Sequence, residues 1–444
     1  MLDQSFSAEN FRTILDIENR KGRYLEGHFF PKFKELTEEI KQCNEEIRIK
    51  RRELGKDEDA LQELYEKRET LKKAKEDQLS DELRKISEKV ITRSFEIELK
   101  RIDIPDDKPI YTVSDIPEHF FAMKQIQKNV SRLFDVKQAN RSAIVSQVKM
   151  LLDDEFPKFV LRTDIEDFYE SIPHERILEK INEENLLTPF SRKLLRRILE
   201  QYKAKSGADK GIPRGIGVSA YIAELYMRDI DRAIKALRDV TYYARYVDDI
   251  VIIFTPHPHE HSRDYVNDVR DIVEKKHNLK LKDAKTEPFD LRAQKHNFKL
   301  EYLGYAIAFG NGEVKVSMTR KKCQKYRQRL DLAFSAYKTH GKASEKMAQK
   351  LLVKRLRFLT GNTRLINNKK NILIGIYYSN SQLTEQGDLI ALDAYLRHKI
   401  DSLINSQLKE RLLKYSFLKG YEMRRFSPFK PQELSKLMEI WGKR

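Results

Sequence analysis

Ten consecutive residues carry the strongest signal in this chain: Arg245-Tyr246-Val247-Asp248-Asp249-Ile250-Val251-Ile252-Ile253-Phe254. Apolar residues flank the two aspartates, a pattern typical of buried strands. Two ionised carboxylates are costly there unless a positive charge, usually a divalent metal, offsets them. Adjacent strand side chains point to opposite faces, so we expect the pair at a tight hairpin turn, with Asp248 as the better ligand and Asp249 in support. A merely polar turn is the alternative.

A second strand pattern comes earlier in the chain. Residues 159–164 are largely apolar and end on Asp164, and the aromatic pair Phe168 and Tyr169 follows. Two-metal phosphoryl transfer needs carboxylates from separate strands, which hold ions about 3.5–4 Å apart. Asp164 and Asp248 on neighbouring strands would meet that need.

Five segments resemble, in the family's own order, motifs A to E of reverse transcriptases: residues 164–169, 211–219, 246–249, 281–286 and 300–305. Motif C of this family is an aromatic, any residue and two aspartates, and motif B is a glycine-rich loop that leads into a helix. The resemblance implies an α+β right-hand polymerase, with fingers, a palm built on an antiparallel sheet and a helical thumb. It also implies RNA-directed DNA synthesis, a nucleotidyltransferase activity.

The resemblance assigns catalytic roles by position. Asp164, Asp248 and Asp249 match the catalytic carboxylates, and together with Ile165 they are expected to bind two Mg²⁺ ions, with Mn²⁺ as a substitute. Lys285 matches the motif D lysine, which is proposed in the family to protonate pyrophosphate as a general acid. An ordinary solvated lysine is the alternative for that position.

Substrate contacts are implied in the same way. Tyr169 matches the aromatic residue beneath the incoming sugar, which excludes a ribose 2′-hydroxyl and favours dNTPs; packing on the core is its alternative. Pro213, Arg214 and Gly215 form the motif B loop, expected to contact the nucleotide or template. The family most often has glutamine where Arg214 stands.

Two further expectations concern the primer and the triphosphate. Leu303 and Gly304 match the primer grip of motif E. Arg141 and Lys137 precede motif A at roughly the distance of fingers residues that hold the triphosphate, and a guanidinium fork suits phosphate oxygens.

Composition favours a nucleic-acid partner. The formal net charge is +17 and the pI about 9.4, as in proteins that lie along phosphate backbones. Cys43 and Cys323 stand in unrelated segments, which argues against disulfides, zinc and secretion. No apolar run approaches the roughly 20 residues of a membrane span. We therefore expect a bacterial cytoplasmic protein with no membrane partner.

Three regions are predicted: an N-terminal helical region over residues 1–100, fingers and palm over 101–318, and a basic helical thumb with the C-terminal region over 319–444. Residues 31–90 are highly charged with apolar residues at helical spacing, and residues 54–59 interrupt them with a helix stop and an acidic helix start. An antiparallel helical hairpin fits this pattern best. It could brace the fingers, form an oligomer or hold RNA.

Within the family, the chain resembles the bacterial defence-associated reverse transcriptases, including the abortive-infection group, with a retron-related palm. This resemblance implies antiphage defence with a structured noncoding RNA, a primer-template, and a second defence protein or another copy of the chain as partner. Untemplated or protein-primed DNA synthesis is one alternative. A non-catalytic RNA-binding scaffold is another, of a different class.

Overall fold

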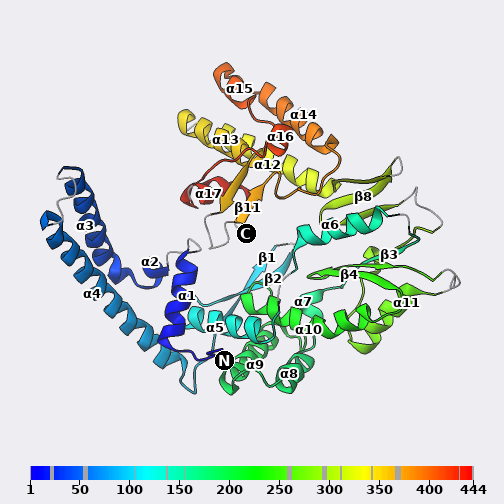
Figure 1. Ribbon diagram of the computed structural model, residues 1–444, viewed down its shortest axis with the longest axis horizontal. Coiled ribbons are helices and arrows are strands. Elements are labelled where there is room, and N and C mark those ends of the chain that lie inside the picture. Colours follow the sequence, from blue (N-terminus) through cyan, green and yellow to red (C-terminus); the bar gives the residue numbers. More distant parts are fainter. Residues whose placement is uncertain are drawn as a thin grey trace. The chain divides into compact units, whose positions relative to one another are not determined.

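The computed structural model describes residues 2–20, 25–53, 59–105, 107–136, 139–154, 156–257, 263–292, 298–310, 313–341, 344–365, 372–429 and 431–442. The chain forms two compact units: Met1–Lys137 with Asp167–Asp229, and Gln138–Glu166 with Ile230–Arg444. Both combine helices with antiparallel strands (Figure 1). The expected α+β class is confirmed, whereas the three predicted regional boundaries stay a prediction.

The N-terminal part of the first unit is helical. Its elements are α1 (Ala8–Arg20), α2 (Leu25–Phe29), η1 (Pro31–Phe33), α3 (Lys34–Glu53) and α4 (Asp59–Val90). Helices α3 and α4 pack antiparallel, since Arg51 near the end of α3 donates to Tyr65 near the start of α4 at 2.8 Å. The buried Cys43 thiol donates to the Leu64 carbonyl at 3.3 Å. The predicted helical hairpin is confirmed; residues 54–58 of its expected break lie outside the described residues.

The rest of the first unit holds one small sheet and further helices. Strands β1 (Leu99–Ile104) and β2 (Asp107–Val113) pair antiparallel. The helices are α5 (Pro117–Leu133), α7 (Phe168–Ser171), α8 (His174–Glu183), α9 (Pro189–Ser206) and α10 (Gly217–Lys235), which ends in the second unit. The helix expected after the motif B loop is therefore present as α10.

A four-stranded antiparallel sheet organises the second unit. Its order is β4-β5-β3-β6, with β3 (Phe159–Asp164), β4 (Val240–Tyr246), β5 (Asp249–Phe254) and β6 (Glu287–Asp290). Motifs A and C thus lie on the neighbouring central strands β3 and β5, as predicted.

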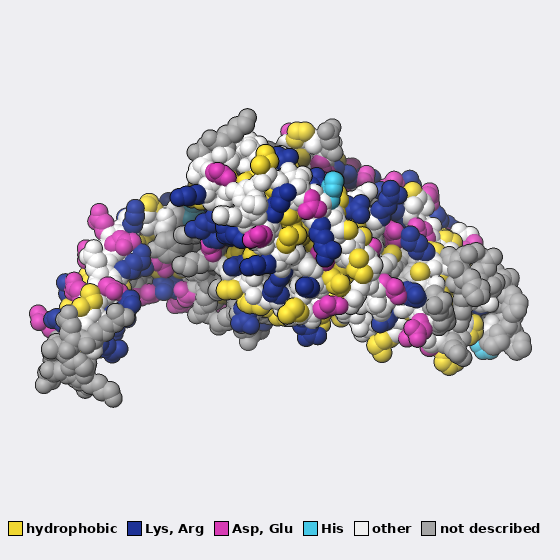
Figure 2. Space-filling view, turned by 90° about the horizontal axis from the view of Figure 1, so that it is seen from above, with side chains coloured by type: hydrophobic (Ala, Val, Ile, Leu, Met, Phe, Trp, Pro, Cys, Tyr) yellow, Lys and Arg dark blue, Asp and Glu magenta, His cyan; other side chains and the backbone are white. Residues whose placement is uncertain are grey.

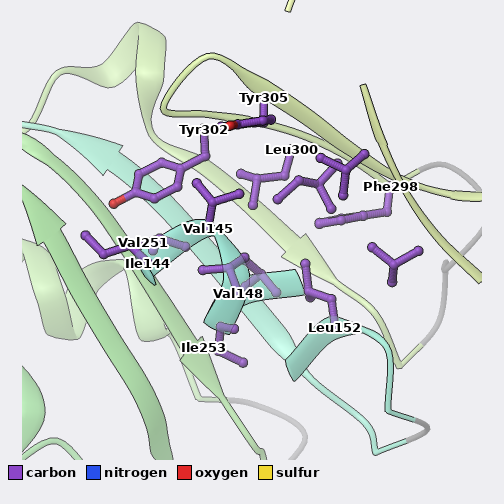
Figure 3. Packing of buried hydrophobic residues seen from close by; sticks show 14 of the residues in the cluster. Ile144, Val145, Val148, Leu152, Val251, Ile253, Phe298, Leu300, Tyr302 and Tyr305 are labelled. Carbon is purple, nitrogen blue, oxygen red and sulfur yellow. The ribbon is translucent and has the colours of Figure 1, made fainter. Parts of the chain in front are cut away.

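Both faces of the central strands are covered. On one face, α6 (Arg141–Leu152) and the sheet of β7 (Lys299–Tyr302), β8 (Tyr305–Gly310) and β9 (Glu313–Met318) form an apolar core with Val160, Val251 and Ile253. Figure 3 shows side chains of α6, β5 and β7 packed together in this core. On the other face, Tyr265 of α11 (Tyr265–Arg270) stacks on Phe254. Covered faces explain why β5 is rich in isoleucine and valine, and why β3 begins with the apolar residues Phe159, Val160 and Leu161.

The C-terminal part of the second unit is mainly helical. It contains α12 (Arg320–Gly341), α13 (Glu345–Leu359), α14 (Gly387–Asp401), α15 (Ser406–Leu412), α16 (Phe417–Glu422), α17 (Pro431–Met438) and η4 (Glu439–Trp441). Most of these helices share one core. Its two-stranded sheet, β10 (Asn362–Leu365) with β11 (Ile372–Gly375), was not predicted from the sequence. Among the described helices, none has both the length and the apolar character that crossing a membrane requires.

Candidate active site

The turn that joins β4 to β5 is a two-residue hairpin turn at Val247 and Asp248. Val247 has a positive φ of 63°, whereas the φ of Asp248 is not positive. A positive φ at the first of the two turn residues alone is typical of a type II′ turn. Glycine usually takes the first position of such a turn, and a β-branched residue is strained there. The predicted hairpin is confirmed, and its apex carries strain beside the aspartate pair.

Asp164 and Asp249 are direct cross-strand partners of β3 and β5. Side chains of opposed residues lie on the same face of an antiparallel pair, with Cβ atoms about 4.5–5.5 Å apart. Asp164 is 6% exposed and Asp249 is partly buried. Asp248, at the turn, is also partly buried, and its carbonyl accepts from the Ile165 amide at 3.2 Å. The register therefore brings Asp249, rather than Asp248, directly opposite Asp164.

Two basic side chains balance this carboxylate pair. Lys285 Nζ lies 2.5 Å from Asp164 Oδ2, at the end of η3 (Asp283–Lys285). Arg162 Nε lies 3.3 Å from Asp249 Oδ1, and Arg162 also contacts Glu287 of β6. Burial raises the pKa of Asp249 to about 6, and the charges of Asp164 and Asp248 act in the same direction, against Arg162 and Lys285. Burial thus makes the ionised form of Asp249 costly, and a bound cation would offset that cost.

Ile165 follows Asp164 directly and forms an isolated antiparallel bridge to Leu281. The bonds of this bridge come from the Glu166 amide and the Asp164 carbonyl, which pair with Lys280 and Lys282. The Ile165 carbonyl takes no part in those two bonds. It is the group through which Ile165 could act as a metal ligand.

The donor set fits a hard divalent cation, because Mg²⁺ and Mn²⁺ prefer carboxylate and carbonyl oxygens. Within the described part of the chain, however, no group of three or more His, Cys, Asp or Glu residues is placed to hold a metal ion. Mg²⁺ sites are commonly completed by substrate phosphates and water. The residues therefore suit ions held by one or two carboxylates together with a nucleotide.

The hairpin turn has an anchor that the sequence analysis missed. Arg245 is 8% exposed and donates to both carboxylate oxygens of Asp231 on α10, at 2.9 and 2.8 Å. Its third nitrogen donates to the Val247 carbonyl at 2.8 Å, and Tyr243 donates to Asp231 at 2.6 Å. This network fixes the turn to a helix. Of this network, the sequence indicated only that an arginine precedes motif C.

The predicted primer grip, Leu303 and Gly304, forms the turn between β7 and β8. Both residues have positive φ, 48° and 76°, as in a type I′ turn. Arg141 Nε donates to the Leu303 carbonyl at 2.8 Å, and a Cβ added to Gly304 would lie 2.8 Å from the Arg141 guanidinium. Glycine is therefore favoured here by its conformation, and a side chain would also displace the Arg141 guanidinium. In this structure Arg141 braces the grip turn, so its expected role in triphosphate binding stays a prediction.

A basic cavity of about 690 Å³ lies beside Asp249. It extends from Asp249 past the primer-grip turn to the first half of α12. Its acidic lining residues are Asp249 and Glu301, and its basic ones are Arg141, Arg162, Lys285, Lys321, Lys322, Lys325 and Arg329. Such a lining suits a polyanion whose reactive end lies at the carboxylates.

Lys322 is the unusual cation of this cavity. Its Nζ donates to the Ser379 carbonyl at 2.8 Å and lies 4.4 Å from the centroid of the Tyr305 ring. Burial lowers the pKa of Lys322 to about 7, and the charge of Arg141 adds to this effect. Below pH 7 the folded chain must hold a poorly solvated ammonium group.

This predicts a pH-dependent stability difference for Lys322→Met, which keeps an unbranched side chain without the charge. A lysine pKa lowered on folding makes the unfolded state bind more protons between the two pKa values, so stability rises with pH there. From pH 7 to pH 9, the free energy of unfolding of the wild type should rise by about 1–2 kcal/mol relative to that of the variant. This rise is smaller than the full effect of about 1.36 kcal/mol per pH unit, because the Lys322 side chain is partly exposed. Urea denaturation at both pH values measures it, with the exposed Lys321→Met as control. A constant difference between wild type and variant would contradict the prediction.

The remaining predicted site residues belong to the first unit, and those of the motif B loop contact residues of the same unit. Arg214 pairs with Glu170 at 3.2 Å, and its guanidinium lies 5.8 Å from the Tyr169 ring centroid. The Arg214 carbonyl accepts from the Tyr111 amide at 2.6 Å. A Cβ on Gly215 would meet the Tyr111 carbonyl at 2.7 Å. The motif B loop is thereby fixed against strand β2, and Gly215 is needed for that close approach.

Two other contacts complete the loop. The buried Ser219 hydroxyl donates to the Pro213 carbonyl at 2.7 Å, and the Ile212 amide donates to the Tyr169 carbonyl at 2.7 Å. Motif B and the segment after motif A are therefore bonded through their main chains. Lys137 lies outside the described residues.

Lys108 of β2 is a further basic residue that the sequence analysis missed. Its ammonium group bonds to Asp167 and, at 3.0 Å, to Glu170. It therefore joins the β1–β2 hairpin to the turn that follows motif A. A single lysine in a chain with 86 basic residues gives no sequence signal for such a role.

Comparisons with known proteins give one family match and several similar solved structures. Residues 112–307 match the family model described as reverse transcriptase (RNA-dependent DNA polymerase). Among solved structures, the chain is similar to apo telomerase from Candida tropicalis truncated from its C-terminal domain, at 14% identity and a TM-score of 0.38, over 52% of this chain and 56% of that one. It is also similar to telomerase from Candida albicans in complex with a TWJ fragment of telomeric RNA, at 11% identity and a TM-score of 0.37, over 78% and 64%.

The chain thus spans less than two thirds of either telomerase. The search of curated proteins gives no match. Residues 112–307 of the chain form a reverse transcriptase domain, the domain of RNA-directed DNA polymerases.

Proposed function

We propose that the chain is an RNA-directed DNA polymerase that adds dNTPs to a 3′-hydroxyl. The observation that carries the proposal is the cross-strand pair of Asp164 and Asp249, with Asp248 at the adjoining turn, inside a reverse transcriptase domain. Two Mg²⁺ ions, when bound, supply activation of the attacking hydroxyl and stabilisation of the leaving pyrophosphate.

The chain's own residues would divide the remaining work. Asp164, Asp249 and Asp248, with the Ile165 carbonyl, would hold the ions. Lys285, which contacts Asp164, would give a proton to the departing pyrophosphate.

Nucleic acid and nucleotide would be held by other groups. The basic cavity would hold the strand that ends at the carboxylates, because its lining is rich in cations. Tyr169 would exclude a ribose 2′-hydroxyl by its volume. This assigns dNTPs rather than NTPs as substrates.

A primer-extension assay tests the proposal. The full chain, a DNA primer annealed to an RNA template, Mg²⁺ and dNTPs should give products whose sequence is complementary to the template. Chelation of the metal or replacement of dNTPs by NTPs should suppress the product. Products unrelated to the template would favour untemplated synthesis instead, and no incorporation with any primer or template would overturn the proposal.

We further propose a role in bacterial antiphage defence, with a structured noncoding RNA and with a second defence protein or another copy of this chain. Its support is the sequence resemblance to abortive-infection and retron-related enzymes, together with the net charge of +17. Lysine and arginine side chains recur across the described surface in Figure 2, interspersed with acidic and hydrophobic ones. Sequencing the nucleic acid that co-purifies with the chain from its host tests this role; recovery of bulk cellular RNA alone would contradict it.

A further inference from the structure

One face of α12 leads away from the cavity beside Asp249. Lys321, Lys325 and Arg329 follow each other at four-residue intervals, so they lie on one face of the helix. They span about 12 Å along its axis at 1.5 Å per residue. All three line the basic cavity, which therefore follows the helix axis away from the carboxylates.

A second cavity, of about 460 Å³, continues the first. Lys325, Tyr326, Arg329 and Ser379 line both cavities, so the two are joined along α12. The character of the lining changes from basic to apolar and aromatic, with Phe358 and Trp441 among its residues. Both cavities belong to the second unit.

Large apolar side chains stand open to solvent at this second cavity. Leu332 is 46% exposed and Met438 is 41% exposed, and both line it. Exposed apolar groups inside a concave site mark a binding surface more often than chance exposure does. Methionine adapts to the flat face of a ligand.

Trp441 is held in a fixed orientation within the cavity. Its ring stacks on Phe358 at a centroid distance of 5.9 Å and an angle of 22°. Its indole nitrogen donates to the Arg329 carbonyl at 3.0 Å, and the Arg329 guanidinium lies 5.9 Å from the ring centroid. A preorganised aromatic ring beside cations is the arrangement that proteins use to stack a nucleobase while gripping its phosphates.

We propose that the second cavity binds an unpaired base of a nucleic-acid strand that lies along α12, with Lys325 and Arg329 on its phosphates. The statement that this strand ends at the carboxylates rests on the proposed function, whereas the base site itself does not depend on it. A duplex would present its sugar-phosphate backbone here and leave the apolar lining without a partner, whereas an unpaired base covers it. Stacking of one base contributes about 1–3 kcal/mol.

Trp441 is the chain's single tryptophan, so its fluorescence reports on this cavity directly. The full chain, without metal or dNTPs, is titrated with a 12-nucleotide single-stranded DNA, an abasic strand of the same length, a blunt duplex, and a dNTP. The single strand should quench the emission, and the abasic strand and the duplex should not. Lys325→Gln and Arg329→Gln should each weaken quenching by about tenfold in Kd at low salt, since each removes a phosphate contact. The exposed Lys338→Gln, farther along α12, is the matched control and should leave Kd unchanged.

Three results would overturn the inference. These are equal quenching by the abasic strand, equal quenching by the duplex, or saturation by a dNTP at the Kd of the oligonucleotide. Because the titration needs no catalysis, quenching in a chain that fails to extend primers would support the base site and count against the proposed function alone. Primer extension without quenching would support the proposed function and count against the base site.

Discussion

Asp249→Asn is expected to abolish dNTP incorporation, with a loss of at least about a thousandfold, and Asp164→Asn should do nearly the same. Each change removes one carboxylate of a pair that faces the same side of the sheet, and groups that act as one catalytic unit lose activity together rather than additively. The double variant should therefore be little worse than either single one. Single-turnover primer extension measures all three.

Stability separates this loss from unfolding. Asp249 has a pKa raised to about 6 because it is buried beside Asp164, so removing its charge should not lower the melting temperature. Asp290→Asn is the matched control. Asp290 lies on β6 opposite Phe159, at the end of β3 that is far from Asp164, so this variant should keep its activity. An Asp249→Asn chain that still extends primers at more than a tenth of the wild-type rate would remove Asp249 from the catalytic set.

The strands and the hairpin could be predicted from the sequence because buried strands leave long apolar, β-branched runs. Residues 250–254 show such a run and residues 159–161 a shorter apolar one, and two residues between strands permit a tight turn. The helical hairpin was predictable for a similar reason, since apolar residues recurred at helical spacing over 31–90. Both features depend on local periodicity, which a sequence displays directly.

The relative positions of Asp248 and Asp249 could not be predicted, because they depend on the register between β3 and β5. A shift by one residue would have placed the other aspartate opposite Asp164. The partner of Arg141 was hidden for a related reason. The Leu303 carbonyl that it contacts lies 162 residues away in the chain, and no local pattern encodes that approach.

Asp231→Ala is expected to have the largest effect on stability, lowering the free energy of unfolding by about 3–5 kcal/mol. Its carboxylate is the bidentate partner of Arg245, whose side chain is 5% exposed, and removing one member of a buried pair leaves the other charge uncompensated. The same change deprives the Tyr243 hydroxyl of its acceptor. Urea denaturation followed by circular dichroism measures the loss.

A double-mutant cycle shows whether the pair also positions the turn. Arg245→Met removes the buried charge, so Asp231→Ala combined with Arg245→Met should be more stable than Asp231→Ala alone. Asp231→Ala removes the tie of Arg245 to α10, and the double variant also lacks the bond from Arg245 to the Val247 carbonyl, so the turn that carries Asp248 loses its anchor to α10 in both. Incorporation per folded molecule should therefore stay low in the double variant even where stability recovers. Recovery of incorporation together with stability would mean that the network only supports the fold, because the strained turn would then keep its geometry without Arg245.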